Sequence, residues 1–296
     1  IPDGRGLWHL WPLRLCGAAR AVVRRLACLA ALALAACSAA PAREAASALP
    51  RLVSLNPCTD AILAEVADPE QLLAVSAYSH DPASSSMDLA KARQFRATGG
   101  SVEEILALRP DVVVGASFMP PATAQALEQL GFRLERFGIA PTVEESKAQV
   151  RQLAALAGHP ERGEALVARI DVALARAAPP PGAPVAAVVW QSGGIVGGAD
   201  TLVSDVLVRT GFANMAAQEG LRQADHLPLE AMIARPPRVI FAAGAHEANE
   251  DRMLSNPALA RLKDTRREPL DPALLWCGGP TIPRLAERLA KARRAQ

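Results

Sequence analysis

One pattern occurs twice in the sequence, and it constrains the fold more than any other feature. A short helical segment, an Arg-Pro break and a hydrophobic strand follow one another at 101–114 and again at 227–241. In each copy a glutamate, Glu103 or Glu230, lies in the first helical turn. Because a pattern repeated along a chain is typical of a duplicated structural unit, the sequence predicts two similar lobes.

Short apolar runs and helical segments alternate through both halves of the chain. Runs such as Val112–Val114 are typical of strands buried on both faces of a parallel sheet. Helix starts are marked by capping residues: Ser101 is followed three positions later by Glu104, which is a capping-box spacing. Such alternation predicts an α/β fold with parallel sheets. The expected strands are 52–55, 72–76, 112–114, 133–137, 185–190 and 239–242, and the expected helices are 61–66, 102–108, 122–130, 202–210, 229–234 and 283–294.

The most regular apolar period lies between the two copies of the pattern. It runs from Thr142 to Ala177 and predicts one long helix, with Gly158-His159-Pro160 as the place where that helix would bend. Pro179-Pro180-Pro181-Gly182 then ends it. The expected organisation is an N-terminal lobe at 51–140, a linking helix at 141–178 and a C-terminal lobe at 184–296.

Residues 1–50 have the composition of a targeting segment and a tether. Two arginines precede an apolar run from Leu26 to Ala36, which is too short to span a bilayer of about 30 Å as a helix. The run ends Leu34-Ala35-Ala36-Cys37, which resembles a bacterial lipobox, so Cys37 is the expected lipidation site. The alternative is a plain secretory signal. Residues 38–50 are rich in Ala, Ser and Pro and predict a flexible tether.

Charge and motif content exclude several classes of function. Lysine and arginine total 32 against 30 acidic residues, a formal charge of +2, so no nucleic-acid partner is expected. The sequence has no phosphate-binding loop, no nucleophile elbow and no His-Glu-x-x-His helix. The glycine-rich stretch 191–198 lacks the dinucleotide-binding spacing and indicates a turn. An enzyme is therefore not expected, and no cofactor is predicted.

The opening Arg-Leu-Val-Ser-Leu-Asn-Pro-Cys-Thr-Asp, Gly99-Gly100, the two repeated patterns and the long segment between them carry a resemblance. Residues 51 to about 290 resemble the helical-backbone class of periplasmic binding proteins that serve iron-siderophore, heme and cobalamin importers. The resemblance implies two parallel-sheet lobes joined by one long helix, with the ligand in a cleft between them. It also implies that Glu103 and Glu230 dock into the permease dimer of an ATP-binding cassette (ABC) importer. The alternative for both glutamates is simple stabilisation of a helix end.

Ligand-binding residues are expected in the loops that follow the strands, as in open α/β sheets generally. Tyr78 and Trp190 could be ring platforms for a ligand or core residues with a polar tip, and His80 and His226 could bind a metal ion or be solvated. Gly99-Gly100 stand where cobalamin binders carry aromatic residues, which disfavours cobalamin. The predicted ligand-binding set is Asn56, Tyr78, His80, Asp81, Phe118, Trp190, Gln191, His226 and Trp276.

Two cysteines remain once the first fifty residues are set aside. Cys58 and Cys277 form an even pair in an exported protein, which favours a disulfide, while two reduced thiols or a site for a thiophilic metal are the alternatives.

The predicted function is that of a periplasmic, lipid-anchored substrate-binding protein that delivers a metal chelate (ferric siderophore, cobalamin or heme) to its permease. The alternatives are direct binding of a metal ion, or a lipoprotein that scavenges or senses chelates without transport. If the predicted function is correct, the lipid anchor is the only part of the protein that contacts the membrane.

Overall fold

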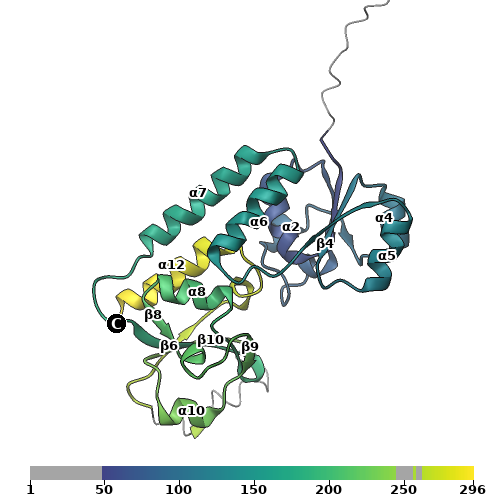
Figure 1. Cartoon of the computed structure of the whole chain (residues 1–296). Coiled ribbons are helices and arrows are strands. Elements are labelled where there is room, and N and C mark those ends of the chain that lie inside the picture. The colour runs from purple at the N-terminus through teal and green to yellow at the C-terminus, as the bar shows by residue number, and fades with distance from the viewer. Residues whose placement is uncertain (1–48, 245–255, 258–261) are drawn as a thin grey trace, which may run out of the picture. The chain divides into compact units, whose positions relative to one another are not determined.

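The computed structural model describes residues 49–244, 256–257 and 262–296 (Figure 1). The expected signal sequence, most of the tether and Cys37 lie outside the described residues. Leu49 to Gln296 make up one compact unit. No helix in the described part of the chain is long and apolar enough to cross a membrane.

The first sheet has five parallel strands in the order β3-β2-β1-β4-β5. Parallel neighbours require crossover connections, and helices supply them here. The predicted α/β fold is therefore confirmed in this half. The elements are β1 (Leu52–Ser54), α2 (Pro57–Val66), β2 (Leu72–Ser76), the 3-10 turn η1 (Ala77–His80), α3 (Leu89–Ala92), β3 (Ala97–Thr98), α4 (Val102–Leu108), β4 (Val112–Ala116), α5 (Pro121–Gln129) and β5 (Arg133–Phe137).

The second sheet has the order β11-β10-β6-β7-β9, with β8 also paired to β6. It is mostly parallel, but β7 runs antiparallel to β6 and to β9. The sequence predicted only parallel strands and a turn at 191–198. The turn is the short segment Ser192–Gly194, which is too short for a crossover and so returns the chain as a hairpin. The elements are β6 (Val185–Gln191), η2 (Ser192–Gly194), β7 (Ile195–Gly197), α8 (Leu202–Arg209), β8 (Phe212–Asn214), α9 (Met215–Gln218), β9 (Ala224–His226), α10 (Leu229–Ala234), β10 (Val239–Ala243), β11 (Arg266–Pro269), η4 (Pro272–Leu274) and α12 (Thr281–Arg294).

Four strands of each sheet are arranged in the same order. The strand order β2-β1-β4-β5 of the first sheet corresponds to β8-β6-β10-β11 of the second. In the first sheet β1 lies between β2, which follows helix α2, and β4, which ends the first copy of the repeated pattern. In the second sheet β6 lies in the same way between β8, which follows helix α8, and β10, which ends the second copy. Within that pattern α4 precedes β4, and α10 precedes β10. The duplicated architecture predicted from the repeated pattern is what the described residues form.

The segment between the sheets differs from the expected single helix. It forms two helices, α6 (Val143–Leu156) and α7 (Pro160–Arg176). Gly158 has φ +83°, His159 has non-helical dihedral angles, and Pro160 begins α7, where its missing N–H costs nothing. The three residues expected to bend one helix instead end one and begin the next.

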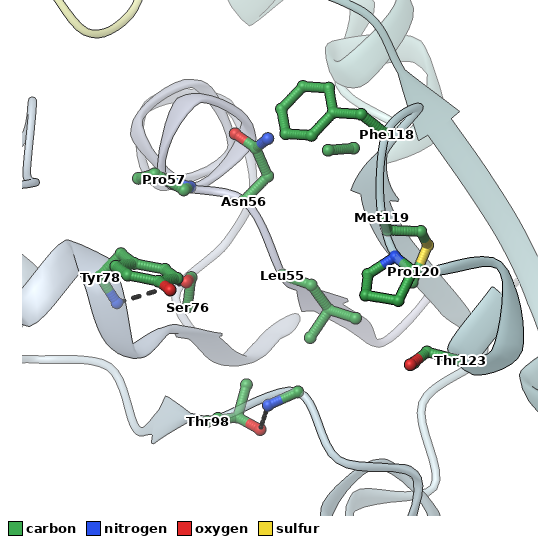
Figure 2. A pocket seen from close by; sticks show the side chains of 13 residues that line it. Leu55, Asn56, Pro57, Ser76, Tyr78, Thr98, Phe118, Met119, Pro120 and Thr123 are labelled. Atoms are coloured by element: carbon green, nitrogen blue, oxygen red, sulfur yellow. Dashed lines mark hydrogen bonds between the residues drawn. The ribbon is translucent and has the colours of Figure 1, made fainter.

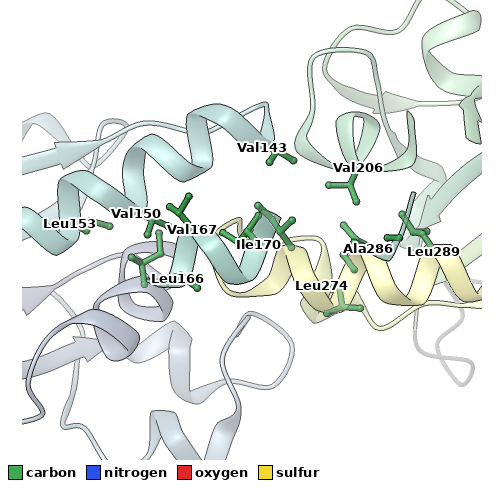
Figure 3. Close-up of a cluster of buried hydrophobic side chains, with 14 of the residues drawn as sticks. Val143, Val150, Leu153, Leu166, Val167, Ile170, Val206, Leu274, Ala286 and Leu289 are labelled. Carbon is green, nitrogen blue, oxygen red and sulfur yellow. The ribbon is translucent and has the colours of Figure 1, made fainter. Parts of the chain in front are cut away.

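The two helices pack closely against each other (Figure 1). A Cβ placed on Gly163 of α7 would lie 2.6 Å from the Cβ of Ala154 on α6, so a glycine is needed at this approach. Figure 3 shows the apolar cluster that these helices form with α8, η4 and α12. Its labelled members are Val143, Val150, Leu153, Leu166, Val167, Ile170, Val206, Leu274, Ala286 and Leu289.

Candidate ligand-binding site

A pocket of about 380 Å³ lies at the carboxyl edge of the first sheet (Figure 2). Four of its lining residues end a strand or directly follow one: Leu55 after β1, Ser76 in β2, Thr98 in β3 and Ala116 in β4. Because parallel strands bring their carboxyl ends to one edge, ligands of open α/β sheets bind at such an edge. The full lining is Leu55, Asn56, Pro57, Ser76, Tyr78, Thr98, Gly99, Gly100, Ala116, Phe118, Met119, Pro120 and Thr123.

The lining is mostly apolar and has no charged side chain. Two aromatic rings stand largely in solvent beside it: Tyr78 is 64% exposed and Phe118 is 67% exposed. Two exposed rings beside one pocket can bury a large apolar area against a ligand. The pocket therefore favours a ligand with a large uncharged or delocalised face over a small ion.

Capping residues at the starts of helices α2 and α4 position part of the pocket lining. Asn56 is the N-cap of α2, and its Oδ1 accepts a hydrogen bond of 2.7 Å from the Cys58 N–H. On the opposite side Thr98 Oγ1 donates to Glu104 Oε2 at 2.7 Å and accepts from the Gly100 N–H at 3.1 Å. Glu104 is also the acidic member of the capping box predicted for α4, which is present.

Three of the predicted ligand-binding residues, Asn56, Tyr78 and Phe118, line the pocket. Sequence reasoning missed Leu55, Ser76 and Thr98, although each stands at a strand end and that position could have identified them. The glycines at 99 and 100 were noted for the resemblance alone. Gly100 has φ +80°, a conformation that favours glycine and brings the backbone against the pocket.

Two predicted residues of the following loop lie outside the lining. His80 has its Nε2 3.0 Å from the Ala92 carbonyl oxygen and is half-buried. Asp81 is exposed and accepts hydrogen bonds from the Ala83 N–H and from Ser84 Oγ, and these bonds lower its pKa. Both side chains organise the loop, and neither reaches the pocket.

Next to the pocket residue Ser76 lies a buried carboxylate that sequence reasoning did not single out. Asp60 is 0% exposed, and its Oδ2 accepts from the Ser76 N–H at 2.8 Å and from Ser79 Oγ at 2.7 Å. The other oxygen, Oδ1, has no hydrogen-bond partner in the described part of the chain. Burial raises the pKa of Asp60 to about 7, although the nearby Ser54 hydroxyl and the hydrogen bonds from Ser79 and Ser76 oppose that rise.

Trp190 is a core residue of the second sheet, which was one of the two alternatives for it. Its side chain is 0% exposed within a cluster that includes Val188, Val196 and Met215, and its Nε1 has no hydrogen-bond partner among residues 49–244, 256–257 and 262–296. A fully buried ring cannot be a platform for a ligand. The prediction that Trp190 binds the ligand is therefore wrong.

The other predicted residues of the C-terminal half are not in the pocket lining. Gln191 pairs with Ile195 in the β6–β7 hairpin. His226 is exposed, with Nδ1 3.1 Å from the Gly193 carbonyl oxygen. Trp276 is 49% exposed. Their contact with a ligand stays a prediction.

A disulfide joins Cys58 of α2 to Cys277, with a Cα–Cα distance of 5.0 Å. The segment after it packs tightly: the Gly279 N–H donates to Ser146 Oγ of α6 at 2.8 Å, and a Cβ on Gly278 would overlap that same oxygen. The disulfide therefore fastens the chain just before α12 to the first turn of α2. That turn begins with Pro57 and is capped by Asn56, and both residues line the pocket.

Both glutamates of the repeated pattern are exposed. Glu103 lies in the first turn of α4 and Glu230 in the first turn of α10. Their role in docking stays a prediction. Among the described residues, no group of three or more His, Cys, Asp or Glu side chains is arranged to hold a metal ion.

Comparison with known proteins shows which family has this architecture. The model of the family described as "Periplasmic binding protein" matches residues 52–267. None of the curated proteins compared is similar enough to the chain to count as a relative.

Several solved structures share the fold. A periplasmic heme-binding protein from Pseudomonas aeruginosa is 28% identical, with a TM-score of 0.63 over 82% of this chain and 92% of its own. The periplasmic heme-binding protein RhuT from Roseiflexus sp. RS-1, in apo form, is 23% identical, with a TM-score of 0.64 over 83% and 97%. The periplasmic vitamin B12-binding protein BtuF of Vibrio cholerae is 20% identical, with a TM-score of 0.63 over 83% and 98%.

The family match covers most of the chain, and it spans both copies of the repeated pattern and the pocket. The chain therefore belongs to the periplasmic binding protein family.

Proposed function

We propose that this chain is the substrate-binding component of an ABC importer, which binds a metal chelate in the periplasm and delivers it to a permease dimer. The family match over residues 52–267 carries this proposal. The pocket supports it, because an uncharged lining with exposed rings suits a chelate in which the metal charge is already neutralised by the organic ligand.

Heme is the chelate that we place first. The solved structure with the highest identity among those compared above is named as a heme-binding protein. Tyr78 and Phe118 offer ring faces to a flat macrocycle. A bare metal ion is disfavoured, because a first shell of three or more ligands is not assembled among the described residues.

Binding of hemin to the full chain tests the ligand class, with the absorbance of the bound porphyrin as the readout. Replacing Phe118 by Ala removes an exposed ring of the pocket, and we expect the Kd to rise about tenfold, the size of one aromatic contact. Ile139→Ala is the matched control, because Ile139 is also an exposed apolar residue but lies outside the lining. Equal effects of the two changes would argue against this pocket, and absence of hemin binding would argue against heme as the cargo.

The exposed glutamates of α4 and α10 are the proposed docking groups. They occupy equivalent places in the two copies of the repeated pattern, as a partner with two-fold symmetry requires. Charge pairs of this kind set orientation and association rate more than affinity. We expect Glu103→Ala with Glu230→Ala to retain chelate binding and to lose most uptake into cells.

The matched control replaces two other exposed acidic residues, Glu70 and Glu128, by Ala. Uptake should then be unchanged. If the docking pair also leaves uptake unchanged, docking through these residues is refuted. If chelate is bound but no uptake occurs in any variant or in the wild type, the protein is a scavenger or sensor.

Lipid anchoring through Cys37 completes the proposal. The sequence Leu34-Ala35-Ala36-Cys37 supports it. Cys37→Ser should release the protein from the membrane fraction without changing hemin affinity, because the pocket lies in residues 55–123. Retention of the variant in that fraction would exclude lipidation at this cysteine.

A further inference from the structure

The only tyrosine of the chain, Tyr78, lies in a turn whose two ends are hydrogen-bonded to a buried side chain. The turn η1 (Ala77–His80) follows β2 directly, and its start is capped by Ser76, whose Oγ accepts from the Tyr78 N–H at 3.3 Å (Figure 2). The phenol ring projects from this short segment into the pocket region. Its placement therefore depends on what fixes the two ends of the turn.

Asp60 contacts both ends. One oxygen, Oδ2, accepts from the Ser76 N–H before Tyr78 and from Ser79 Oγ after it, at 2.8 and 2.7 Å. Both bonds are buried, so water does not compete for them. Hydrogen bonds to an ionised acceptor are about twice as strong as neutral ones. A single carboxylate thus bonds to one residue before and one residue after the pocket tyrosine.

Among the residues that the structure describes, no cation acts on the Asp60 carboxylate. The pKa of its carboxylate is raised by burial and lowered by the Ser54 and Ser79 hydroxyls and the Ser76 N–H. Within the turn, the titratable neighbours are Tyr78 and His80, and the His80 Nε2 is bonded to the Ala92 carbonyl oxygen.

The charged groups of the neighbouring helices are paired elsewhere. Glu65, farther along α2, pairs with Lys91 of α3 and with Arg169 of α7. Asp81, after the turn, bonds to Ala83 and Ser84.

We propose that Asp60 is the positioning residue for Tyr78: its buried carboxylate holds both ends of the turn that presents the tyrosine to the pocket. The inference rests on the proposed function in one respect, namely that Tyr78 contacts the cargo. Protonation of the carboxylate weakens both bonds and loosens the turn. Because burial raises the pKa of Asp60 to about 7, the loosening occurs as the pH falls through the neutral range.

The first experiment needs no ligand. With tyrosine labelled by carbon-13, the full chain gives one tyrosine ring signal, because Tyr78 is the only tyrosine. In a His80→Gln background, which removes the neighbouring imidazole, the signal should shift with pH and show one inflection near 7. Asp60→Asn keeps the side-chain shape without the titration, so the inflection should disappear. Ser84→Ala, which removes a hydroxyl of the same loop that bonds to Asp81 instead, should keep it.

The second experiment measures hemin affinity at pH 8. Ser79→Ala removes one of the two bonds to Asp60 and should raise the Kd about tenfold, whereas Ser84→Ala should leave it unchanged. Persistence of the inflection in Asp60→Asn, or a Ser79→Ala variant with the wild-type tyrosine signal, would overturn the proposal. If wild-type protein does not bind hemin, the proposed cargo fails while the labelled tyrosine still decides the role of Asp60. Should Asp60→Asn not fold, the tyrosine signal of Ser79→Ala decides it.

Discussion

The Cys58–Cys277 disulfide should be a large single contribution to the stability of this chain. It closes a loop with a sequence separation of 219 residues. In the chain-entropy treatment the gain grows with the logarithm of loop length, and a loop of this size corresponds to about 5 kcal/mol at room temperature. Changing Cys58 and Cys277 both to Ser removes the bond with little change in side-chain size. We expect the free energy of unfolding to fall by about that amount.

Guanidinium unfolding followed by far-UV circular dichroism measures this loss. Three samples are compared: oxidised wild type, wild type with reductant, and the double-serine variant. Because the gain arises in the unfolded ensemble, the variant should also unfold with a steeper denaturant dependence, since its unfolded chain is less compact.

Reductant should leave the double-serine variant unchanged, which controls for the three other cysteines, Cys16, Cys28 and Cys37. A loss below about 1 kcal/mol, or a wild type indifferent to reductant, would refute the loop-closure reasoning.

Two further predictions concern buried contacts. The folded-state pKa of Asp60, about 7, exceeds the unfolded value of about 3.9, because the cost of burying the charge outweighs the hydrogen bonds that the charge strengthens. The free energy of unfolding is therefore highest below pH 4 and falls as the pH rises to 7. The free energy of unfolding should fall by an amount on the order of 4 kcal/mol over this range. Asp60→Asn should remove the corresponding dependence of Tm on pH. If Tm depends on pH equally in the variant and in the wild type, groups other than Asp60 cause the dependence. Gly278→Ala should lower Tm by several degrees through overlap with Ser146 Oγ, while Gly138→Ala, with only an ordinary contact, should not; equal Tm values for the two variants would contradict the packing described for Cys277–Gly279.

Local chemistry made much of the fold predictable. Ser101 and Glu104 form the capping box expected from their spacing, and α4 begins and ends at the predicted residues. The strand at 133–137 also has its predicted bounds. These elements carry their own signals, because a cap or an apolar run bounded by turn residues is readable from adjacent residues alone.

Features that depend on distant contacts were not predictable. The chain breaks at Gly158–Pro160 because α7 packs back on α6, where only a glycine at 163 allows the approach to Ala154. The period of apolar residues is the same whether one helix or two result. Trp190 likewise lies near the end of a strand in either interpretation, and only the packing of α9 and β7 against it decides that the ring is buried.

The first turn of α2 joins the features that matter for binding. Asn56 and Pro57 line the pocket, Cys58 forms the disulfide, Thr59 Oγ1 bonds to β1 through Ser54, and Asp60 holds the turn that carries Tyr78. Five consecutive residues thus connect four parts of the molecule: the pocket, the segment at Cys277, β1 and the turn η1. A small shift of this turn would move the pocket floor and its tyrosine together, because Asn56 and Asp60 belong to the same helical turn and the Asp60 N–H bonds to the Asn56 carbonyl oxygen. The disulfide at its centre therefore restrains the geometry of the pocket as well as the stability of the chain.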